Sequence, residues 1–541
     1  MSCASIDSIT LPNKNKDTFW NSKSNIYLYA NVSIVLKTHY RSIMLLLGID
    51  IGTSSIKVSV VDADTQACVA SIRYPEDHEN NILSVVPGWA EQAPDMWWEQ
   101  VVAAIGKLTS DATFKVRDIG AVGIAYQMHG LVVTDEEGNA LRNSIIWCDS
   151  RAVSIGEAAF KAMGEPFALE HLLNSPGNFT ASKWAWVKAN EPDVYAKAHH
   201  IMLPGDYIAM KLTGTATTSI SALSEGIFWD FKNNRISREV LAHFGFDEAV
   251  FPEIRPLFGE HGTLRKDVAA QLGLPPGIPV SYKAGDQPNN ALSLNVLEPG
   301  EVAATAGTSG VIYAVSDQLV YDHASRVNTF AHVNYTPASP RTGVLLCING
   351  TGILNRWAKD HFGHGLTYAQ MNDLGKAVAP GSNGLKIFPF GNGAERFLHN
   401  KILGARFVDL DFNAHGRSQV FRASQEGIAY AFRYGLDILR ENGMNPAVIR
   451  AGRANMFLSE LFTEIFVEAT GVPVELYNSD GSVGAALGAG IGAGIFTSPA
   501  EAFSKQELLK TVEPRKTGSY EVLYEEWRAL LDTQLAGEIG E

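Results

Sequence analysis

LLLGIDIGTSSIKVSVVD, at residues 45–62, combines a short apolar run, a turn of small residues and a second run in which apolar residues alternate. This pattern predicts a β-hairpin, because alternate residues of a strand face the same side. Further along, residues 119–125 predict another strand, and residues 96–108 predict a helix with Asp95 as its N-cap. Strands and helices alternate, which indicates an α/β fold.

A second copy of the hairpin pattern occurs much later in the chain. Residues 51–62 read IGTSSIKVSVVD and residues 306–317 read AGTSGVIYAVSD, with Gly, Thr, Ser, Val and Asp at matching places. Two such units, one at the start of each half, predict two related domains that face each other across a cleft. The turn Leu-Glu-Pro-Gly at 297–300 marks the expected division into domains at residues 44–297 and 298–541.

Residues 1–43 differ in composition from the rest of the chain. They are rich in Asn, Ser and Lys and lack the charged head, apolar core and cleavage site of a signal peptide. Met44 stands directly before the first strand. We therefore expect residues 1–43 to be a disordered, dispensable appendage, with Met44 as an alternative start.

Composition excludes several classes of protein. The 541 residues include 44 Lys and Arg against 58 Asp and Glu, and the net charge of −14 argues against a nucleic-acid surface. With 46% hydrophobic residues, disorder is not the dominant state, and no run of 18 apolar residues needs a membrane. The four cysteines lie far apart without a CxxC pair, so a reducing cytoplasm fits best.

Each Gly-Thr-Ser turn offers backbone N–H groups and two hydroxyls that can cradle a phosphate. An ordinary hairpin turn is the alternative for one copy, but two copies can grip a polyphosphate from both sides. Asp50 lies two residues before the first glycine, where its carboxylate can hold Mg²⁺ through water. The alternative is a buried Asp bonded to turn amides. The candidate phosphate-binding residues are Gly52, Thr53, Ser54, Gly307, Thr308 and Ser309.

Three motifs together resemble the FGGY family of carbohydrate kinases, which belongs to the actin-like, ribonuclease-H-like ATPase superfamily. Residues 45–62 resemble the first phosphate motif and residues 303–310, AATAGTSG, resemble the second. Residues 283–291, KAGDQPNNA, resemble the segment that carries the catalytic aspartate. The resemblance runs from about residue 45 to residue 494. It implies an α/β fold of two actin-like ATPase domains that flank a central cleft, with ATP and Mg²⁺ as cofactors.

Within this family, the xylulose kinases are similar at further places. These are PGWAEQAPDMWW at residues 87–98, QMHG at 127–130 and WCDSR at 147–151. Asp286 is implied as the base that takes a proton from a sugar hydroxyl while that oxygen attacks the γ-phosphate. A helix N-cap is the alternative for Asp286, and a structural role is the alternative for His129. The implied sugar-binding residues are Gln127, Met128, His129, Asp149, Arg151, Asp286 and Gln287.

Four segments depart from the family pattern or leave two roles open. In RAGRAN at 450–455, only Gly452 and Asn455 match the adenosine motif, so nucleotide preference stays open. GAER at 393–396 resembles the family's G-E-R without the proline that follows, which favours structural roles. Gln287 stands where xylulose kinases often carry Asn. Residues 481–494 have glycines four apart, which predicts a helix whose bare face serves either packing or close approach of a nucleotide.

The resemblance implies ATP-dependent phosphorylation of a ketose, D-xylulose to D-xylulose 5-phosphate in pentose catabolism. Two alternatives stay open: a kinase for another small sugar or polyol, such as ribulose or an alditol, and a non-catalytic, nucleotide-dependent sugar sensor of the same fold. The expected partners are a small sugar and MgATP, without nucleic acid or membrane. The oligomeric state stays open, with a homodimer among the options.

Overall fold

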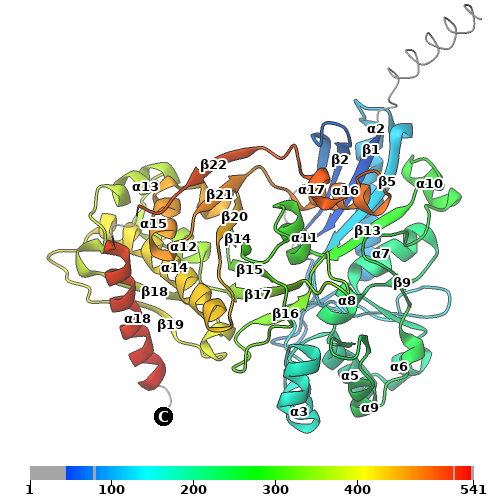
Figure 1. Ribbon diagram of the computed structural model, residues 1–541, viewed down its shortest axis with the longest axis horizontal. Helices are drawn as coiled ribbons and strands as arrows, with labels where there is room; N and C mark the ends of the chain where they lie inside the picture. Colours follow the sequence, from blue (N-terminus) through cyan, green and yellow to red (C-terminus); the bar gives the residue numbers. More distant parts are fainter. Residues whose placement is uncertain (1–43, 77–80, 516–517, 538–541) are drawn as a thin grey trace, which may run out of the picture. The chain divides into compact units, whose positions relative to one another are not determined.

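The computed structural model describes residues 44–76, 81–515 and 518–537, so the expected appendage at residues 1–43 lies outside the described residues (Figure 1). The first large sheet has the order β13-β5-β1-β2-β3. Strands β1 and β2 are antiparallel and in register from Leu45 opposite Asp62 to Ile51 opposite Ile56, which confirms the predicted hairpin. Strands β1, β5 and β13 are parallel. The bounds are β1 Leu45–Ile51, β2 Ile56–Asp62, β3 Cys68–Tyr74, β5 Ile119–Tyr126 and β13 Val280–Gly285.

The second large sheet repeats this arrangement. Its order is β16-β17-β15-β14-β20-β21-β22, with β14 and β15 antiparallel and with β14, β20 and β21 parallel. Strands β17-β15-β14-β20-β21 therefore correspond one by one to β3-β2-β1-β5-β13, and the repeat seen in the sequence extends from one hairpin to a whole sheet. The bounds are β14 Glu301–Ala306, β15 Gly310–Ser316, β16 Asn328–Ala331, β17 Thr342–Ile348, β20 Val448–Gly452, β21 Val474–Tyr477 and β22 Leu508–Val512.

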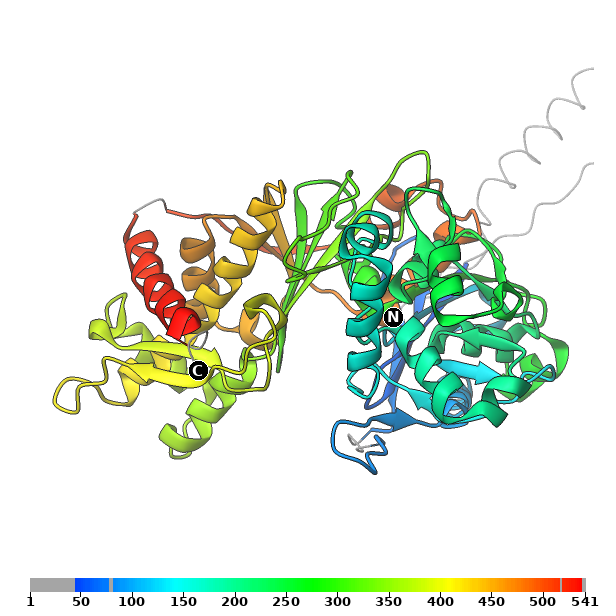
Figure 2. The same ribbon diagram turned by 90° about the horizontal axis from the view of Figure 1, so that it is seen from below.

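Helices cover both sheets. Helix α2 (Pro94–Ser110) packs on β2 and β3 through Trp97, Val101 and Ile105, which recur at helical spacing and are buried. In Figure 2 the helices α14, α15 and α18, yellow, orange and red, gather on one side of the second sheet. The other helices of six residues or more are α3 Val153–Met163, α5 Thr180–Asn190, α6 Pro192–Lys197, α7 Pro204–Thr213, α8 Ile220–Glu225, α9 Arg238–Phe244, α10 Lys266–Leu272, α11 Asp286–Ser293, α12 Gly352–Phe362, α13 Tyr368–Lys376, α14 Arg417–Glu441, α15 Glu460–Thr470, α16 Gly481–Gly492 and α18 Ser519–Gly537.

The remaining elements are short, and none of the described helices can cross a bilayer, being too short or too polar. Two-stranded ribbons join β4 to β7, β6 to β8, β9 to β12, β10 to β11 and β18 to β19. Their bounds are β4 Glu91–Gln92, β6 Val132–Thr134, β7 Ser144–Ile145, β8 His200–Met202, β9 Thr217–Thr218, β10 Trp229–Asp230, β11 Arg235–Ile236, β12 Glu253–Ile254, β18 Lys386–Phe390 and β19 Gly404–Val408, and the shortest helices are α4 Glu165–Phe167 and α17 Pro499–Ala502.

The prediction that Asp95 caps helix α2 is wrong. The helix begins two residues earlier than predicted, at Pro94, and Ala93 is the N-cap. Proline fits the first turn because its missing N–H would have no helical partner there and its φ is already helical. Asp95 therefore lies inside the first turn, where its Oδ1 accepts a hydrogen bond of 2.7 Å from the Tyr207 hydroxyl.

The glycine-rich helix α16 follows β21 of the second sheet but packs against β1, β5 and β13 of the first. Side chains on its bare face would clash: a Cβ on Gly484 would lie 1.7 Å from the Ser293 hydroxyl, and one on Gly488 would lie 2.8 Å from the Tyr282 ring. Of the two roles predicted for these glycines, the structure supports close packing. The domain division after residue 297 stays a prediction. Helix α16, which covers the first sheet, lies far beyond that boundary in the sequence.

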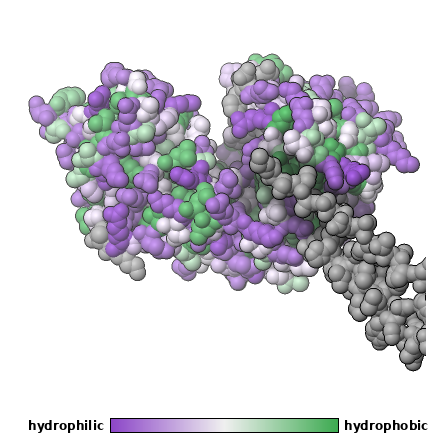
Figure 3. Space-filling view, turned by 90° about the horizontal axis from the view of Figure 1, so that it is seen from above, coloured by the Kyte–Doolittle hydropathy of each residue, from purple (hydrophilic) through white to green (hydrophobic). Residues whose placement is uncertain are grey.

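Helix α11 lies between the two sheets. It follows β13 directly, and it contacts β14 and β15 of the second sheet as well as α16. In Figure 3, seen from above, the surface is hollowed between the two halves, and hydrophilic residues prevail on the face shown. The residue that begins α11 is Asp286.

Candidate active site

The carboxyl ends of β1, β5 and β13 meet at one edge of the first sheet because the three strands are parallel neighbours. Ligands of open α/β sheets bind at such an edge. Asp50 and the first Gly-Thr-Ser turn lie at the end of β1, residues 127–129 follow β5, and Asp286 follows β13. Three segments that are far apart in the sequence therefore bring the predicted phosphate, sugar and base residues to one place.

Asp286 is the first residue of α11, and the N-cap is Gly285, without a side-chain hydrogen bond. The N-cap alternative for Asp286 is therefore wrong. Its Oδ1 is buried and has no hydrogen-bond partner in the described part of the chain. Burial raises the pKa of Asp286 to about 7, and the negative charge of Asp50 adds to the rise. A carboxylate with a free oxygen and a pKa near neutrality suits a general base.

Asp50 lies against the start of helix α16. A Cβ on Gly481 would come within 2.4 Å of Asp50 Oδ2, so glycine allows this close approach. Burial raises the pKa of Asp50 to about 6, the charge of Asp480 raises it further, and Lys57 opposes both. Lys57 itself forms an ion pair with Asp480, which caps α16 by accepting the Ser482 N–H at 2.9 Å.

The acidic pair Asp50 and Asp286 fits a magnesium ion in part. Carboxylate oxygens are hard donors of the kind that Mg²⁺ prefers, and a cation would relieve the repulsion between the two charges. Among the described residues, no three His, Cys, Asp or Glu side chains come together as a metal site. Mg²⁺ would therefore take most of its ligands from phosphate and water, as it does in many nucleotide sites.

His129 presents a hydrogen-bond acceptor at the end of β5. Its Nδ1 lies 3.0 Å from the carbonyl oxygen of Glu225, and because a carbonyl only accepts, Nδ1 carries the proton and Nε2 is bare. Burial lowers the pKa of His129 to about 3, and the positive charges of Lys183 and Arg396 lower it too. The ring is therefore neutral at physiological pH and can accept a hydrogen bond from a sugar hydroxyl.

Glu225, the last residue of α8, is a site residue that sequence reasoning missed. Its side chain is 1% exposed, and its Oε1 accepts the His129 N–H at 3.3 Å. Burial raises its pKa well above the ordinary value, although the His129 N–H opposes this rise. Oε2 has no partner among the residues described and would lie 2.7 Å from a Cβ on Gly285. No motif marks Glu225, and only the folded chain brings it beside His129 and Asp286.

Gln127 ties the first phosphate turn to the sheet edge. Its Nε2 donates to Gln92 Oε1 at 2.8 Å, and its Oε1 lies 3.4 Å from the Thr53 hydroxyl. Gln92 in turn donates to the Thr53 carbonyl at 2.7 Å. The indole N–H of Trp147 donates to the Thr53 hydroxyl at 3.0 Å. These bonds hold the turn in place from two sides.

Met128 and Gln287 flank Gly285, the residue before the candidate base. A Cβ on Gly285 would lie 2.7 Å from Met128 Cγ, so the Met128 side chain packs directly on the backbone that leads to Asp286. Gln287 Oε1 is buried and accepts no hydrogen bond from the described residues. A polar ligand at this edge of the sheet would satisfy it.

Asp149 and Arg151 form an internal network. Arg151 donates to Asp149 through Nε and Nη2 at distances between 2.7 and 3.0 Å, and Arg151 Nη1 lies 2.7 Å from Glu91. The guanidinium stacks 3.8 Å from the Trp89 ring centroid. Asp149 also partly offsets the burial that lowers the pKa of Lys183 to about 7. Their role as direct sugar contacts stays a prediction, and in this structure both side chains have protein partners.

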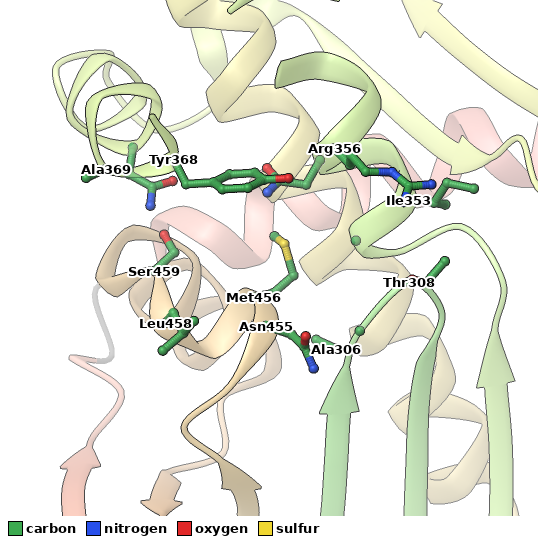
Figure 4. A pocket seen from close by; sticks show the side chains of 14 residues that line it. Ala306, Thr308, Ile353, Arg356, Tyr368, Ala369, Asn455, Met456, Leu458 and Ser459 are labelled. Carbon is green, nitrogen blue, oxygen red and sulfur yellow. The ribbon is translucent and has the colours of Figure 1, made fainter. Parts of the chain in front are cut away.

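The second Gly-Thr-Ser turn opens onto a cavity of about 570 Å³. Figure 4 shows Thr308 and Asn455 on one side of this cavity, with Tyr368 of α13 and Arg356 of α12 opposite. Gly307 also lines it, whereas Ser309 and Gly452 do not. Its size suits a nucleoside with part of its phosphates. The strand ends of β14 and β20 thus bring four of the predicted cofactor residues, namely Gly307, Thr308, Gly452 and Asn455, to one region.

Known proteins resemble the whole described chain. Residues 45–293 match the model of the N-terminal domain of the FGGY family of carbohydrate kinases. The chain is 28% identical over 496 residues to a xylulose kinase of Bacillus subtilis (strain 168), which covers 88% of this chain and 95% of that protein. It resembles the crystal structure of a kinase from Brucella ovis, titled a xyloylose kinase, with a TM-score of 0.81, 27% identity and coverage of 91% and 99%. A xylulose kinase from Rhodospirillum rubrum gives a TM-score of 0.80, 26% identity and coverage of 90% and 98%.

Proposed function

We propose that the chain is a carbohydrate kinase of the FGGY family that phosphorylates D-xylulose with ATP in pentose catabolism. Its residues 45–293 match the model of that family's N-terminal domain, and it is similar to xylulose kinases over most of its length. The product would be D-xylulose 5-phosphate. The observation that carries the reaction is the buried Asp286 Oδ1, which has no hydrogen-bond partner among the described residues, together with the neutral ring of His129, since Glu225 adjoins both residues. The names of the most similar proteins support D-xylulose as the acceptor.

In this proposal the acceptor lies between His129 and Asp286. His129 Nε2 accepts a hydrogen bond from one sugar hydroxyl. Asp286 Oδ1 takes the proton of the reacting hydroxyl while the sugar oxygen forms a bond to the γ-phosphorus and the bond to the departing ADP oxygen breaks. Glu225 and Met128 hold His129 and the start of α11 in position.

MgATP, when bound, supplies the phosphoryl group and the charge that neutralises it. Residues 52–54 and 307–309 would bind its phosphates through backbone N–H groups and hydroxyls. Asp50 would hold Mg²⁺ through water. Gly452 and Asn455 would lie at the adenosine end, beside the cavity at the second turn. Closure of the two domains would exclude water from the transfer.

The cytoplasm is the proposed location. ATP is available there, and Cys68, Cys148 and Cys347 are free thiols, as expected in a reducing compartment. A homodimer stays one option for the oligomeric state.

Steady-state phosphorylation with a panel of acceptors tests the proposal. The full chain with MgATP is assayed with D-xylulose, D-ribulose, ribitol and glycerol, and the product is identified by mass. We expect the highest kcat/KM for D-xylulose, because each unmatched hydroxyl leaves a buried polar group unpaired, which lowers kcat/KM roughly ten- to a hundredfold. Equal turnover of ribitol and D-xylulose would refute this acceptor. Binding of ATP and sugar without any transfer would instead identify a sensor.

A further inference from the structure

Arg396, in the segment predicted to be structural, forms no ion pair with a carboxylate of the described residues. It begins the short 3₁₀ helix Arg396–Leu398 in the second half of the chain. Its Nε donates to the Ser325 carbonyl at 3.0 Å, and its Nη2 donates to the Ser175 hydroxyl at 3.3 Å. Nη1 makes no hydrogen bond within the described residues, and burial lowers the pKa of Arg396 to about 10. A half-buried guanidinium with Nη1 free of protein partners can donate to an oxygen-rich ligand.

The neighbours of Arg396 place it beside His129. Its Cζ lies 5.8 Å from the centroid of the Phe179 ring. That ring meets the His129 ring edge-on at 4.8 Å, and Phe330 lies 5.3 Å from the His129 ring. The charge of Arg396 is close enough to contribute to the low pKa of His129. The two side chains therefore belong to the same wall of the candidate sugar site.

The charges of Arg396 and Asp286 both act on Cys347 of β17. Its side chain is exposed to solvent, yet burial raises the pKa of the thiol to about 11, with Arg396 opposing the rise and Asp286 adding to it. The thiol therefore lies within electrostatic reach of both the guanidinium of Arg396 and the candidate base.

We propose that Arg396 binds the acceptor from the second half of the chain, donating hydrogen bonds to two adjacent acceptor oxygens, and so determines which acceptors are phosphorylated. This inference rests on the proposed function, which places the acceptor at His129 and Asp286. The guanidinium fork matches two oxygens in one plane. Two kinds of acceptor carry such a pair: a ketose with neighbouring hydroxyl and carbonyl oxygens, and a sugar acid with a carboxylate.

Glu395 shows why the sequence suggested a structural role for the whole segment. Its two carboxylate oxygens accept the Asn349 N–H at 2.9 Å and the Gly350 N–H at 3.1 Å. Glu395 therefore fixes the turn after β17, while its neighbour Arg396 lies against Phe179, which packs on His129. Adjacent residues of one motif have separate tasks.

The test compares Arg396→Lys and Arg396→Gln with the unaltered chain. Lysine keeps the charge but lacks the planar fork. We expect the KM for D-xylulose to rise about tenfold for Arg396→Lys and up to a hundredfold for Arg396→Gln, with the KM for ATP within about twofold. The matched control is Arg433→Lys, because Arg433 pairs with Asp437 and Glu521 away from the site. This control should leave both KM values unchanged.

A second acceptor separates the two sources of the oxygen pair. If the pair belongs to a ketose, D-xylulose is phosphorylated, the five-carbon acid D-xylonate is not, and the Arg396 variants weaken D-xylulose binding. If the pair is a carboxylate, the unaltered chain phosphorylates D-xylonate and the variants lose that activity first. Either result supports the inference.

The opposing result is a lower melting temperature with unchanged acceptor KM and preference. Arg396 would then only join Ser175 to Ser325, and the proposed function would stand without it. If the unaltered chain phosphorylates no acceptor, the proposed function fails and this inference with it. Should Arg396→Gln not fold, the charge-conserving Arg396→Lys decides alone.

Discussion

The two large sheets carry corresponding strands in the same order, yet the residues at their carboxyl ends differ in charge. Three residues past β5 lies His129 with φ 62°, and three residues past β20 lies Asn455 with φ 53°. Both have left-handed backbone at equivalent points. Asp50 precedes the first Gly-Thr-Ser turn, whereas Thr305 has the matching place before the second. The shared backbone arrangement determines the positions from which side chains can contact a ligand. The residue type at each position determines the chemistry of that contact.

Buried carboxyl groups lie at the strand ends of the first sheet, whereas none of the described carboxyl groups lines the cavity at the second turn. Asp50, Glu225 and Asp286 all have pKa values that burial raises. The cavity at the second turn is lined mainly by neutral residues, with Arg356 as its charged member. Proton transfer is therefore expected in the first half and nucleotide binding in the second. The following predictions concern changes in one half of the molecule. Most of them also state whether the function assigned to the other half is retained.

The largest effect is expected for Asp286→Asn, which removes the candidate base. Asn has the same size but cannot take a proton, so single-turnover phosphorylation of D-xylulose should fall by about 10² to 10⁴. ATP binding should change little, because Asp286 is not among the residues proposed to bind ATP. If the folded variant transfers phosphate at a near-normal rate, the base lies elsewhere, and Asp50 is the next candidate.

An exchange at the two left-handed positions comes next. His129→Asn keeps a residue that tolerates positive φ and removes the ring, so the KM for D-xylulose should rise about ten- to a hundredfold while the KM for ATP stays nearly constant. Asn455→Gly keeps the backbone freedom and should raise only the KM for ATP. Steady-state kinetics of both variants test this. Two variants that each affect both substrates equally would contradict the division between the halves.

The pH profile should report the first half alone. Asp286 must be deprotonated to act as a base and its pKa is about 7, so kcat/KM should fall about tenfold per pH unit below that value. ATP binding should change little over the same range. The residual activity of Asp286→Asn should lack this acidic limb. A flat profile of the unaltered chain between pH 5.5 and 7 would argue against Asp286 as the base.

The smallest effect concerns stability. Because the pKa of Asp286 is raised on folding, its stabilising contribution is complete below about pH 4 and is lost as pH rises through about 7. Asp286→Asn lacks this loss, so its melting temperature should exceed that of the unaltered chain by a few degrees at pH 8 and by less at pH 5. Thermal melts at both pH values check the sign. A difference that shrinks as pH rises would disprove the burial of this charge.

Local pattern was enough to predict the hairpins. Residues 45–62 and 306–317 form the expected strand pairs because period-two alternation and a small-residue turn act within a few residues. The resemblance to a family then identified the segments that follow β5 and β13. These strands are parallel neighbours, and the sequence alone does not reveal that their ends converge on Asp50.

Tertiary contacts decided the rest. Glu225 contacts His129 and Arg396 contacts Phe179, which packs on His129; neither residue has a local signal for this position. The Asp95 prediction failed because proline at the first helical position outweighed a capping side chain. The resemblance implied that Asp149 binds the sugar, and the fold pairs its carboxylate with the guanidinium of Arg151. Hydrophobic periodicity predicts which face of a helix or strand is buried. It does not predict which side chain from a distant part of the chain packs against that face.

The position of α16 in the chain has a consequence for synthesis. The strands that it covers in the first sheet leave the ribosome first, whereas α16 begins at Gly481, about 195 residues after the end of β13 at Gly285. At roughly 5–20 residues per second, the apolar face of that sheet stays uncovered for about ten seconds or more. During this interval the nascent chain exposes the surface that chaperones bind. A fragment that ends at residue 297 would keep that surface exposed permanently and should aggregate unless residues 481–492 are supplied as a separate peptide.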